Sequence, residues 1–180
     1  MKATESVDRS PFNVVLLATG GTIEKSYDPH SGQLSLAVPV IEGLLESLDM
    51  PDVSVRIERL MAKDSLDITD ADRQAIVYAA QAVLEQGSVD ALVITHGTDT
   101  LAETAVALHV ALGSPGVPVV ITGAMRPYRV AASDAAQNIA QALMAARLLA
   151  PGVHAVMHGR AIDAERVVKD YERLTLTARA

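Results

Sequence analysis

Short apolar runs rich in Val, Ile and Leu alternate along this chain with longer, alanine-rich stretches in which apolar residues recur at helical spacing. The short runs predict strands at 13–19, 53–60, 91–95, 117–122 and 153–158. All but the second are almost continuously apolar, as in strands that lie inside a sheet with both faces covered. The alternation of such strands with helices predicts an α/β fold with three layers, in which a mostly parallel sheet is flanked by helices.

The longer stretches predict helices at 39–48, 70–86, 100–112 and 134–149. Several begin with a residue that favours a helix start: Pro39 suits a first helical position, and Thr69 and Ser133 suit N-caps. Thr100 followed by Glu103 predicts a capping box. Apolar spacing and start residues therefore both support these helices.

The segment 20–36 follows the first strand and has no periodicity, but it is rich in Gly, Ser, Asp and Pro. This composition predicts a long structureless loop. Long loops in compact domains are more often functional than accidental, and open α/β sheets bind ligands beyond the carboxyl ends of their strands. We therefore expect this segment to be a mobile lid over a site at that edge of the sheet.

Composition narrows the class of protein. A length of 180 residues predicts a single domain, 13–180, preceded by an N-terminal tail, 1–12. The net charge of -7 disfavours electrostatic binding of nucleic acid or anionic lipid, and the lack of cysteine excludes disulfides, thiolate catalysis and cysteine-ligated metals. Early charges and the lack of a long apolar run predict neither a signal peptide nor a membrane span. We expect a cytoplasmic protein that acts on a small molecule.

Polar residues cluster directly after the first, third and fourth strands, at 19–22, 96–100 and 123–126. Parallel strands place their carboxyl ends at one edge of a sheet, so we expect these clusters to lie together. Gly20 and Gly21 permit positive φ angles and close approach of a ligand to the backbone, beside the Thr22 hydroxyl. A tight turn explains the same glycines, and the segment lacks the dinucleotide and phosphate-loop patterns, so nucleotide binding is unsupported.

The cluster 96–100 has two interpretations. Asp99 or Thr100 could simply cap the following helix. A carboxylate and a hydroxyl behind an apolar strand nevertheless cost free energy unless they are used, which favours a site. We interpret His96 as a structural histidine with satisfied hydrogen bonds. No other His, Asp or Glu has the spacing of a metal site, so we predict no metal and no cofactor.

Two motifs resemble the signature sequences of the bacterial-type L-asparaginase family: A-T-G-G-T-I at 18–23 and I-T-H-G-T-D-T at 94–100. The run V-P-V-V-I-T-G-A-M-R-P at 117–127 resembles the family's next strand and turn, and Ser65-Leu66-Asp67 resembles its substrate-contacting Ser-x-Asp loop. Order and spacing match over most of the chain. The resemblance implies the Rossmann- or flavodoxin-like N-terminal domain of that family, and hydrolysis of L-asparagine to L-aspartate and ammonia.

The resemblance also implies catalytic roles. Thr22 would be the nucleophile that forms an acyl-enzyme intermediate, and Tyr27 in the loop would help to activate it. Thr98, Asp99 and Lys169 would form a second polar triad, in which Lys169 is placed by matching A-E-R-V-V-K to the family segment that ends in lysine. A threonine hydroxyl needs a neighbouring base, and either Tyr27 or Lys169 would take its proton.

Substrate contacts follow from the same resemblance. Ser65 would hold the α-carboxylate of the amino acid, and Asp99 would hold its α-amino group. The Ala124 carbonyl would accept a hydrogen bond from the side-chain amide. The backbone amides of the turn at Gly21 and of Thr98 would stabilise the oxyanion that forms on attack.

Typical members of this family carry a second, smaller C-terminal domain that donates a carboxylate to the site of a neighbouring protomer, whereas this sequence ends shortly after Lys169. The groups that could replace that carboxylate are Glu24, Asp28 and residues of the stretch Asp170-Tyr171-Glu172. Because the family's sites lie near contacts between protomers, we also expect a homo-oligomer, either a dimer or a tetramer.

Other functions stay open at this stage. The same site could hydrolyse glutamine, or an amide on a larger carrier such as a mischarged tRNA, although the acidic net charge disfavours tRNA. The motifs could also form a non-catalytic amino-acid-binding module, which a ligand would stabilise without ammonia release. As turns and caps of a structural α/β protein, they would give neither stabilisation nor turnover.

Overall fold

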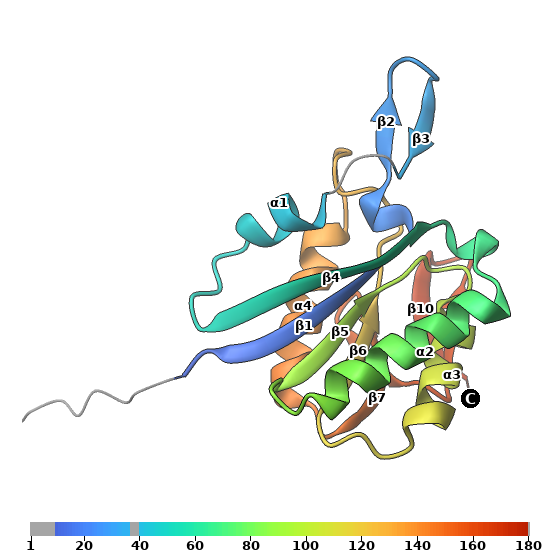
Figure 1. The fold of residues 1–180 in the computed structure, drawn as a ribbon. Helices are drawn as coiled ribbons and strands as arrows, with labels where there is room; N and C mark the ends of the chain where they lie inside the picture. The colour runs from blue at the N-terminus through green and yellow to red at the C-terminus, as the bar shows by residue number, and fades with distance from the viewer. Residues whose placement is uncertain (1–9, 37–39, 180) are drawn as a thin grey trace, which may run out of the picture.

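A six-stranded sheet forms the centre of the molecule, with its strands in the order β4-β1-β5-β6-β7-β8 (Figure 1). The parallel strands are β1 (Phe12–Gly20), β4 (Val53–Lys63), β5 (Ala91–Thr95), β6 (Pro118–Thr122) and β7 (Gly152–Met157). At the edge, β8 (Arg160–Asp163) pairs antiparallel with β7. The predicted parallel order of the strands therefore holds across the sheet up to its last strand.

This computed structural model describes residues 10–36 and 40–179. Residues 1–9 of the predicted tail and Pro39, the predicted helix start, lie outside the described residues. Within those ranges, no helix combines the length and the apolar character needed to cross a membrane.

Helices cover both faces of the sheet (Figure 1). One layer contains α2 (Asp70–Glu85) and α3 (Leu101–Leu112), and the other contains α1 (Ile41–Glu46) and α4 (Ala135–Leu148). The prediction of an α/β fold, with a mostly parallel sheet flanked by helices, is confirmed.

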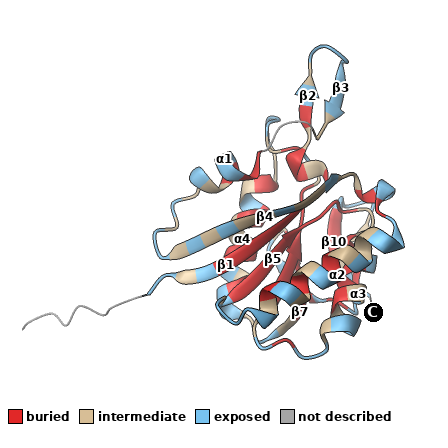
Figure 2. Cartoon of the chain, viewed as in Figure 1, coloured by how far each residue is buried: buried red, intermediate tan, exposed pale blue. Residues whose placement is uncertain are grey.

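Alternate residues of β1 pack against the two helical layers on opposite faces of the sheet. Val15 and Leu17 pack in the apolar cluster that includes α2 and α3, whereas Val14 and Leu16 pack in the cluster that includes α1 and α4. The inner strands β5 and β6 are buried along their whole length, as Figure 2 shows for β5 in red. Burial on both faces explains why these strands are continuously apolar in sequence.

The structure contains short strands that the apolar pattern did not predict. Three of these are β8, β9 (Val167–Asp170) and β10 (Thr175–Ala178), of which β9 and β10 pair antiparallel in a separate two-stranded sheet. Each has four residues and mixed polarity, so no apolar run reveals it.

The segment 20–36 is ordered, and its prediction as a structureless loop is wrong. It begins with a 3₁₀ turn, η1 (Thr22–Glu24), and continues as a hairpin of β2 (Ser26–Asp28) and β3 (Gln33–Ser35). The Asp28 carboxylate accepts hydrogen bonds from the backbone N–H of His30 and the hydroxyl of Ser31. Pro29, Ser31 and Gly32 thus lie in the turn between β2 and β3.

The predicted cap of α2 is confirmed. The Thr69 hydroxyl accepts a hydrogen bond from the Asp72 N–H, and the Asp72 carboxylate accepts one from the Thr69 N–H, which completes a capping box. At the start of α4, the Ser133 hydroxyl accepts a hydrogen bond from the Ala135 N–H at 3.1 Å, but the N-cap position belongs to Asp134.

The predicted capping box of Thr100 and Glu103 is wrong. Thr100 occupies the N-cap position of α3, but its side chain forms no capping hydrogen bond. Its hydroxyl donates instead to the backbone carbonyl of Ser65, at 2.8 Å. A contact between two turns has replaced the local cap.

Candidate active site

Glycines at the carboxyl ends of β1 and β5 let the turns after these strands touch. Gly21 has a φ angle of +78°, and a Cβ atom there would lie only 2.4 Å from the backbone nitrogen of Gly97. Any side chain at Gly21 would therefore collide with the neighbouring turn. The contact places the next residues along the chain, Thr22 and Thr98, on adjoining turns.

Two further glycines extend this close packing. A Cβ atom on Gly97 would lie 2.5 Å from the hydroxyl oxygen of Ser65, and one on Gly123 would lie 2.3 Å from the carbonyl oxygen of His96. The turns after β1, β4, β5 and β6 therefore form one compact group. The polar clusters predicted to share an edge of the sheet do lie together.

We expect Gly21→Ala to lower the free energy of unfolding by about 3 kcal/mol, because alanine is strained at positive φ and its methyl group would overlap the Gly97 backbone. Urea unfolding followed by circular dichroism measures the loss. Gly87→Ala is the matched control: Gly87 has a φ of +65° but open space around it. That variant carries the backbone strain alone, worth about 1 kcal/mol. Equal losses in the two variants would contradict the close packing of Gly21.

Lys169 joins two of the candidate residues in one cluster. From β9, its Nζ atom donates hydrogen bonds to Thr98 Oγ1 at 2.9 Å and to Asp99 Oδ1 at 2.8 Å. The Lys169 side chain is only 11% exposed, so water screens this ion pair less than a pair on the open surface. The structure thus brings together Thr98, Asp99 and Lys169.

Ser65 lies on the other side of Asp99. Its hydroxyl is 3.5 Å from Asp99 Oδ2, a weak contact, and its side chain is buried. One carboxylate oxygen of Asp99 therefore faces Lys169, and the other faces Ser65. The residues expected to hold the α-amino and α-carboxylate groups of an amino acid are neighbours.

Thr22 opens η1 directly after Gly21 and is half-buried. The turn is held at both ends: the Gly21 N–H donates to the Lys63 carbonyl at 2.8 Å, and the Lys25 N–H donates to the Thr22 carbonyl at 3.1 Å. The Lys25 ammonium also pairs with the Asp64 carboxylate, which precedes Ser65. The Thr22 turn and the Ser65 loop are thus tied together.

Sequence reasoning missed this tie. The Lys25 ammonium holds the pKa of the Asp64 carboxyl below its ordinary value, so the carboxylate stays charged. The two residues lie on different loops, 39 positions apart, and no sequence motif joins them. Only the topology of the sheet brings these loops together.

Tyr27 is not part of this group in the structure. It lies on β2, and its side chain is 64% exposed. Figure 1 shows the β2–β3 hairpin projecting from the body of the molecule. Within the described residues, the Tyr27 hydroxyl forms no hydrogen bond with Thr22 or with the Lys169 cluster.

The turn that carries Ala124 is fixed by Asp134. Its carboxylate accepts hydrogen bonds from the N–H groups of Met125 and Arg126, both at 2.9 Å, and contacts the His158 ring at 2.8 Å. Burial would raise the pKa of Asp134, but these hydrogen bonds outweigh it and hold the pKa below its ordinary value. Ala124 itself is buried at the start of this turn.

His96 has the environment of a structural residue, as interpreted from the sequence. It is fully buried, and its ring lies 2.9 Å from the Thr104 hydroxyl and 2.8 Å from the Gly97 carbonyl. Burial lowers the pKa of His96, which favours the neutral ring. Across residues 10–36 and 40–179, no group of three or more His, Cys, Asp and Glu side chains is arranged to hold a metal ion.

Two of the carboxylates proposed as replacement acids, Glu24 and Asp28, already have structural partners. Glu24 is 4% exposed, and one of its oxygens accepts a hydrogen bond from Arg59 at 3.0 Å. Its other oxygen is buried and has no partner among the described residues. Asp28 holds the hairpin turn, where hydrogen bonds from Ser31 and His30 keep its pKa below the ordinary value.

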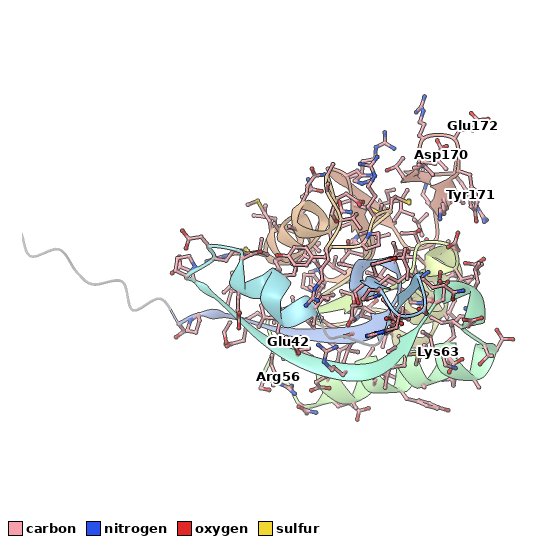
Figure 3. The ribbon with its side chains drawn as sticks, turned by 90° about the horizontal axis from the view of Figure 1, so that it is seen from above. Glu42, Arg56, Lys63, Asp170, Tyr171 and Glu172 are labelled. Carbon is pink, nitrogen blue, oxygen red and sulfur yellow. The ribbon has the colours of Figure 1, made fainter. Side chains whose placement is uncertain are left out.

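The stretch 170–172 continues from Lys169. Asp170 accepts hydrogen bonds from the N–H groups of Glu172 and Arg173 and so closes a turn. The Lys169 ammonium lies 4.9 Å from the centre of the Tyr171 ring, within cation–π range. Figure 3 shows Asp170, Tyr171 and Glu172 together on one projecting turn.

Comparison with known proteins shows which family shares this sequence. The sequence profile described as "Asparaginase, N-terminal" matches residues 13–173. An L-asparaginase of Thermococcus kodakarensis is 32% identical over 158 residues. A glutamyl-tRNA(Gln) amidotransferase subunit of Methanococcus vannielii is 35% identical over 157 residues.

These relatives are longer than this chain. The two matches cover 88% and 84% of the chain but 48% and 35% of the relatives. Among solved structures, L-asparaginase I from Vibrio cholerae gives a TM-score of 0.81 at 27% identity, over 93% of this chain and 51% of that one. The chain therefore spans about half, or less, of the length of the relatives it matches.

Proposed function

Because this chain belongs to the asparaginase family, through the N-terminal domain of that family, we propose that it is an amidohydrolase that converts L-asparagine to L-aspartate and ammonia. The observation that carries the proposal is the cluster of Thr98, Asp99 and Lys169 beside the glycine contact that holds the Thr22 turn. The Thr22 hydroxyl on a fixed turn, with an amine and a carboxylate on the adjoining turn, suits nucleophilic attack on an amide.

In the proposed reaction, Thr22 Oγ1 attacks the side-chain amide carbon of asparagine and loses its proton to a neighbouring base. The carbonyl oxygen becomes an oxyanion, which backbone N–H groups of the turns at Gly21 and Thr98 stabilise from fixed positions. The amide nitrogen takes up a proton and leaves as ammonia. Water then attacks the Thr22 ester, which releases aspartate and restores the hydroxyl.

Ser65 and Asp99 suit the two charged groups at the α-carbon of the substrate. Asp99 offers a carboxylate to the α-amino group, and the Ser65 hydroxyl can donate to the α-carboxylate. Their separation of 3.5 Å is short enough for both to contact one small molecule. Ala124 presents its carbonyl to the amide from the β6 turn.

Two groups are candidates for the base. Lys169 already contacts Thr98 on the turn next to Thr22. Tyr27 is exposed, and its β2–β3 hairpin would have to move toward Thr22 before the two side chains could meet. We therefore assign the proton acceptor to Lys169, which acts across Thr98. Tyr27 acts as a lid residue in this proposal, and a closed hairpin would exclude water from the site.

Glutamine is the second candidate substrate. The observation in its favour is the 35% identity to a glutamyl-tRNA(Gln) amidotransferase subunit. A chain of this kind would work with a partner protein. Glutamine carries the same α-amino, α-carboxylate and side-chain amide groups as asparagine. It is only one methylene longer, so the same polar contacts can serve both amides.

Ammonia release by the purified protein tests the proposal, with L-asparagine, L-glutamine and no substrate in parallel. We expect release from asparagine above release from glutamine. Higher release from glutamine would favour the second candidate. No release from either, with a raised melting temperature in L-aspartate, would overturn the enzyme proposal in favour of an amino-acid-binding module.

A further inference from the structure

β4 leaves one long side of the central sheet open. It is an edge strand of 11 residues, and its only strand partner in the described part of the chain is β1. Its pairing with β1 is regular from Val53 to Arg59, and a bulge follows before Lys63. In Figure 2, β4 is tan and pale blue over most of its length, unlike the red inner strand β5. A long regular edge is a template for pairing with another strand.

The charges on β4 complement each other under a two-fold rotation. Arg56 and Glu58 lie two positions apart and therefore on the same face of the strand, where they form an ion pair. In antiparallel pairing centred on Ile57, Arg56 faces Glu58 of the second copy, and Glu58 faces its Arg56. Opposite charges directly across a strand pair stabilise it, and like charges destabilise it.

The other face of β4 is apolar from residue 53 to residue 57, and Arg59 follows on the same face. Val53, Val55 and Ile57 line a groove of about 350 Å³, whose far wall includes Leu45 and Leu48. The three β4 residues are only half-buried. In the same pairing, Ile57 meets Ile57 of the second copy, and the two grooves adjoin at the rotation axis.

From these features we propose that two copies of this chain associate through antiparallel pairing of their β4 strands, around a two-fold axis at Ile57. The six-stranded sheets then join into one continuous sheet, and the open edges on this side disappear. Figure 3 labels Arg56 on this outer strand. The proposal does not rest on the proposed catalytic function.

Charge reversal tests the pairing. Analytical ultracentrifugation of the wild type should show a dimer. Arg56→Glu and Glu58→Arg each create two like-charge pairs and should raise the dimer dissociation constant by about 100-fold. The double swap Arg56→Glu/Glu58→Arg should restore the dimer. Arg179→Glu, the same charge change at an exposed residue outside β4, is the control.

A mixture of the two single variants gives a more specific test of the pairing. The Arg56→Glu variant carries two acidic residues at these positions, and the Glu58→Arg variant carries two basic ones. An equimolar mixture should therefore form a heterodimer, although neither variant pairs with itself. The heterodimer would also show that both single variants are folded.

A disulfide provides an independent measurement, because the chain has no cysteine of its own. Directly opposed residues of antiparallel strands lie at Cα distances suited to a disulfide. Ile57→Cys should therefore form a covalent dimer under mild oxidation. Ser54→Cys, which faces Leu60 in this pairing, should form none.

A wild-type protein that is monomeric at every concentration would overturn the proposal and leave the edge to a different partner. A dimer that both single charge reversals leave intact would overturn it too, since the contact would then lie elsewhere. Equal cross-linking of Ile57→Cys and Ser54→Cys would contradict the axis at Ile57.

Discussion

Thr22→Ala is expected to lower ammonia release from L-asparagine by at least about 10³-fold, because no other group is proposed to form the acyl intermediate. The fold should survive, since the Thr22 side chain is half-buried and the backbone bonds of its turn remain. A coupled assay of ammonia release measures the rate, and circular dichroism checks the fold.

The Thr22→Ala variant should still bind its ligand although it no longer releases ammonia. Ser65 and Asp99 are untouched, so L-aspartate should still raise the melting temperature of Thr22→Ala. Thr22→Ser is the matched control: it keeps the hydroxyl and should retain measurable turnover. A Thr22→Ala protein with near-normal rate would rule out Thr22 as the nucleophile.

Lys169→Met is expected to lower turnover by about 10²- to 10³-fold, because it removes both the proposed base and the amine that bonds to Asp99. Steady-state kinetics with L-asparagine measures the loss. The effect should fall mainly on kcat, since the Ser65 contact to the substrate remains.

Lys169→Arg separates the two roles of this side chain. Arginine keeps a positive charge beside Asp99 but does not act as a base at neutral pH. A base role predicts that Lys169→Arg is as slow as Lys169→Met. Recovery of activity with arginine would mean that Lys169 acts through its charge alone. Tyr27→Phe, in parallel, reports any contribution of the hairpin.

The sheet was predictable because its inner strands have no polar face. The strands at 91–95 and 117–122 are covered on both sides, so nearly every residue there is apolar and the signal is continuous. β9 and β10 have four residues each and mixed polarity, and they give no such signal. The sequence indicates the core more clearly than it indicates the small elements around it.

The candidate site was predictable where its residues stand next to glycines. Thr22 and Thr98 follow glycines whose positions are now explained by backbone contact between two turns. Lys169 was placed through the family resemblance alone, because a lysine 70 residues from Asp99 gives no spacing signal of its own.

Hydrogen bonds and ion pairs between loops could not be predicted from the sequence. The hydroxyl of Thr100 was expected to cap its own helix, but it bonds to the Ser65 carbonyl of another loop. The Thr100 hydroxyl can bond either within its own helix or to a distant loop. The sequence indicates only the bond within the helix. The same limit hid the pair of Lys25 and Asp64.

The position of Lys169 on β9 has a consequence for the nascent protein. A ribosome makes Asp99 70 residues before it makes Lys169. Until β9 emerges and pairs with β10, the Asp99 carboxylate lacks its cation, although β1, β4, β5 and β6 have all been synthesised. The sheet can therefore begin to fold during translation with its polar cluster still unassembled, and the lysine completes that cluster late.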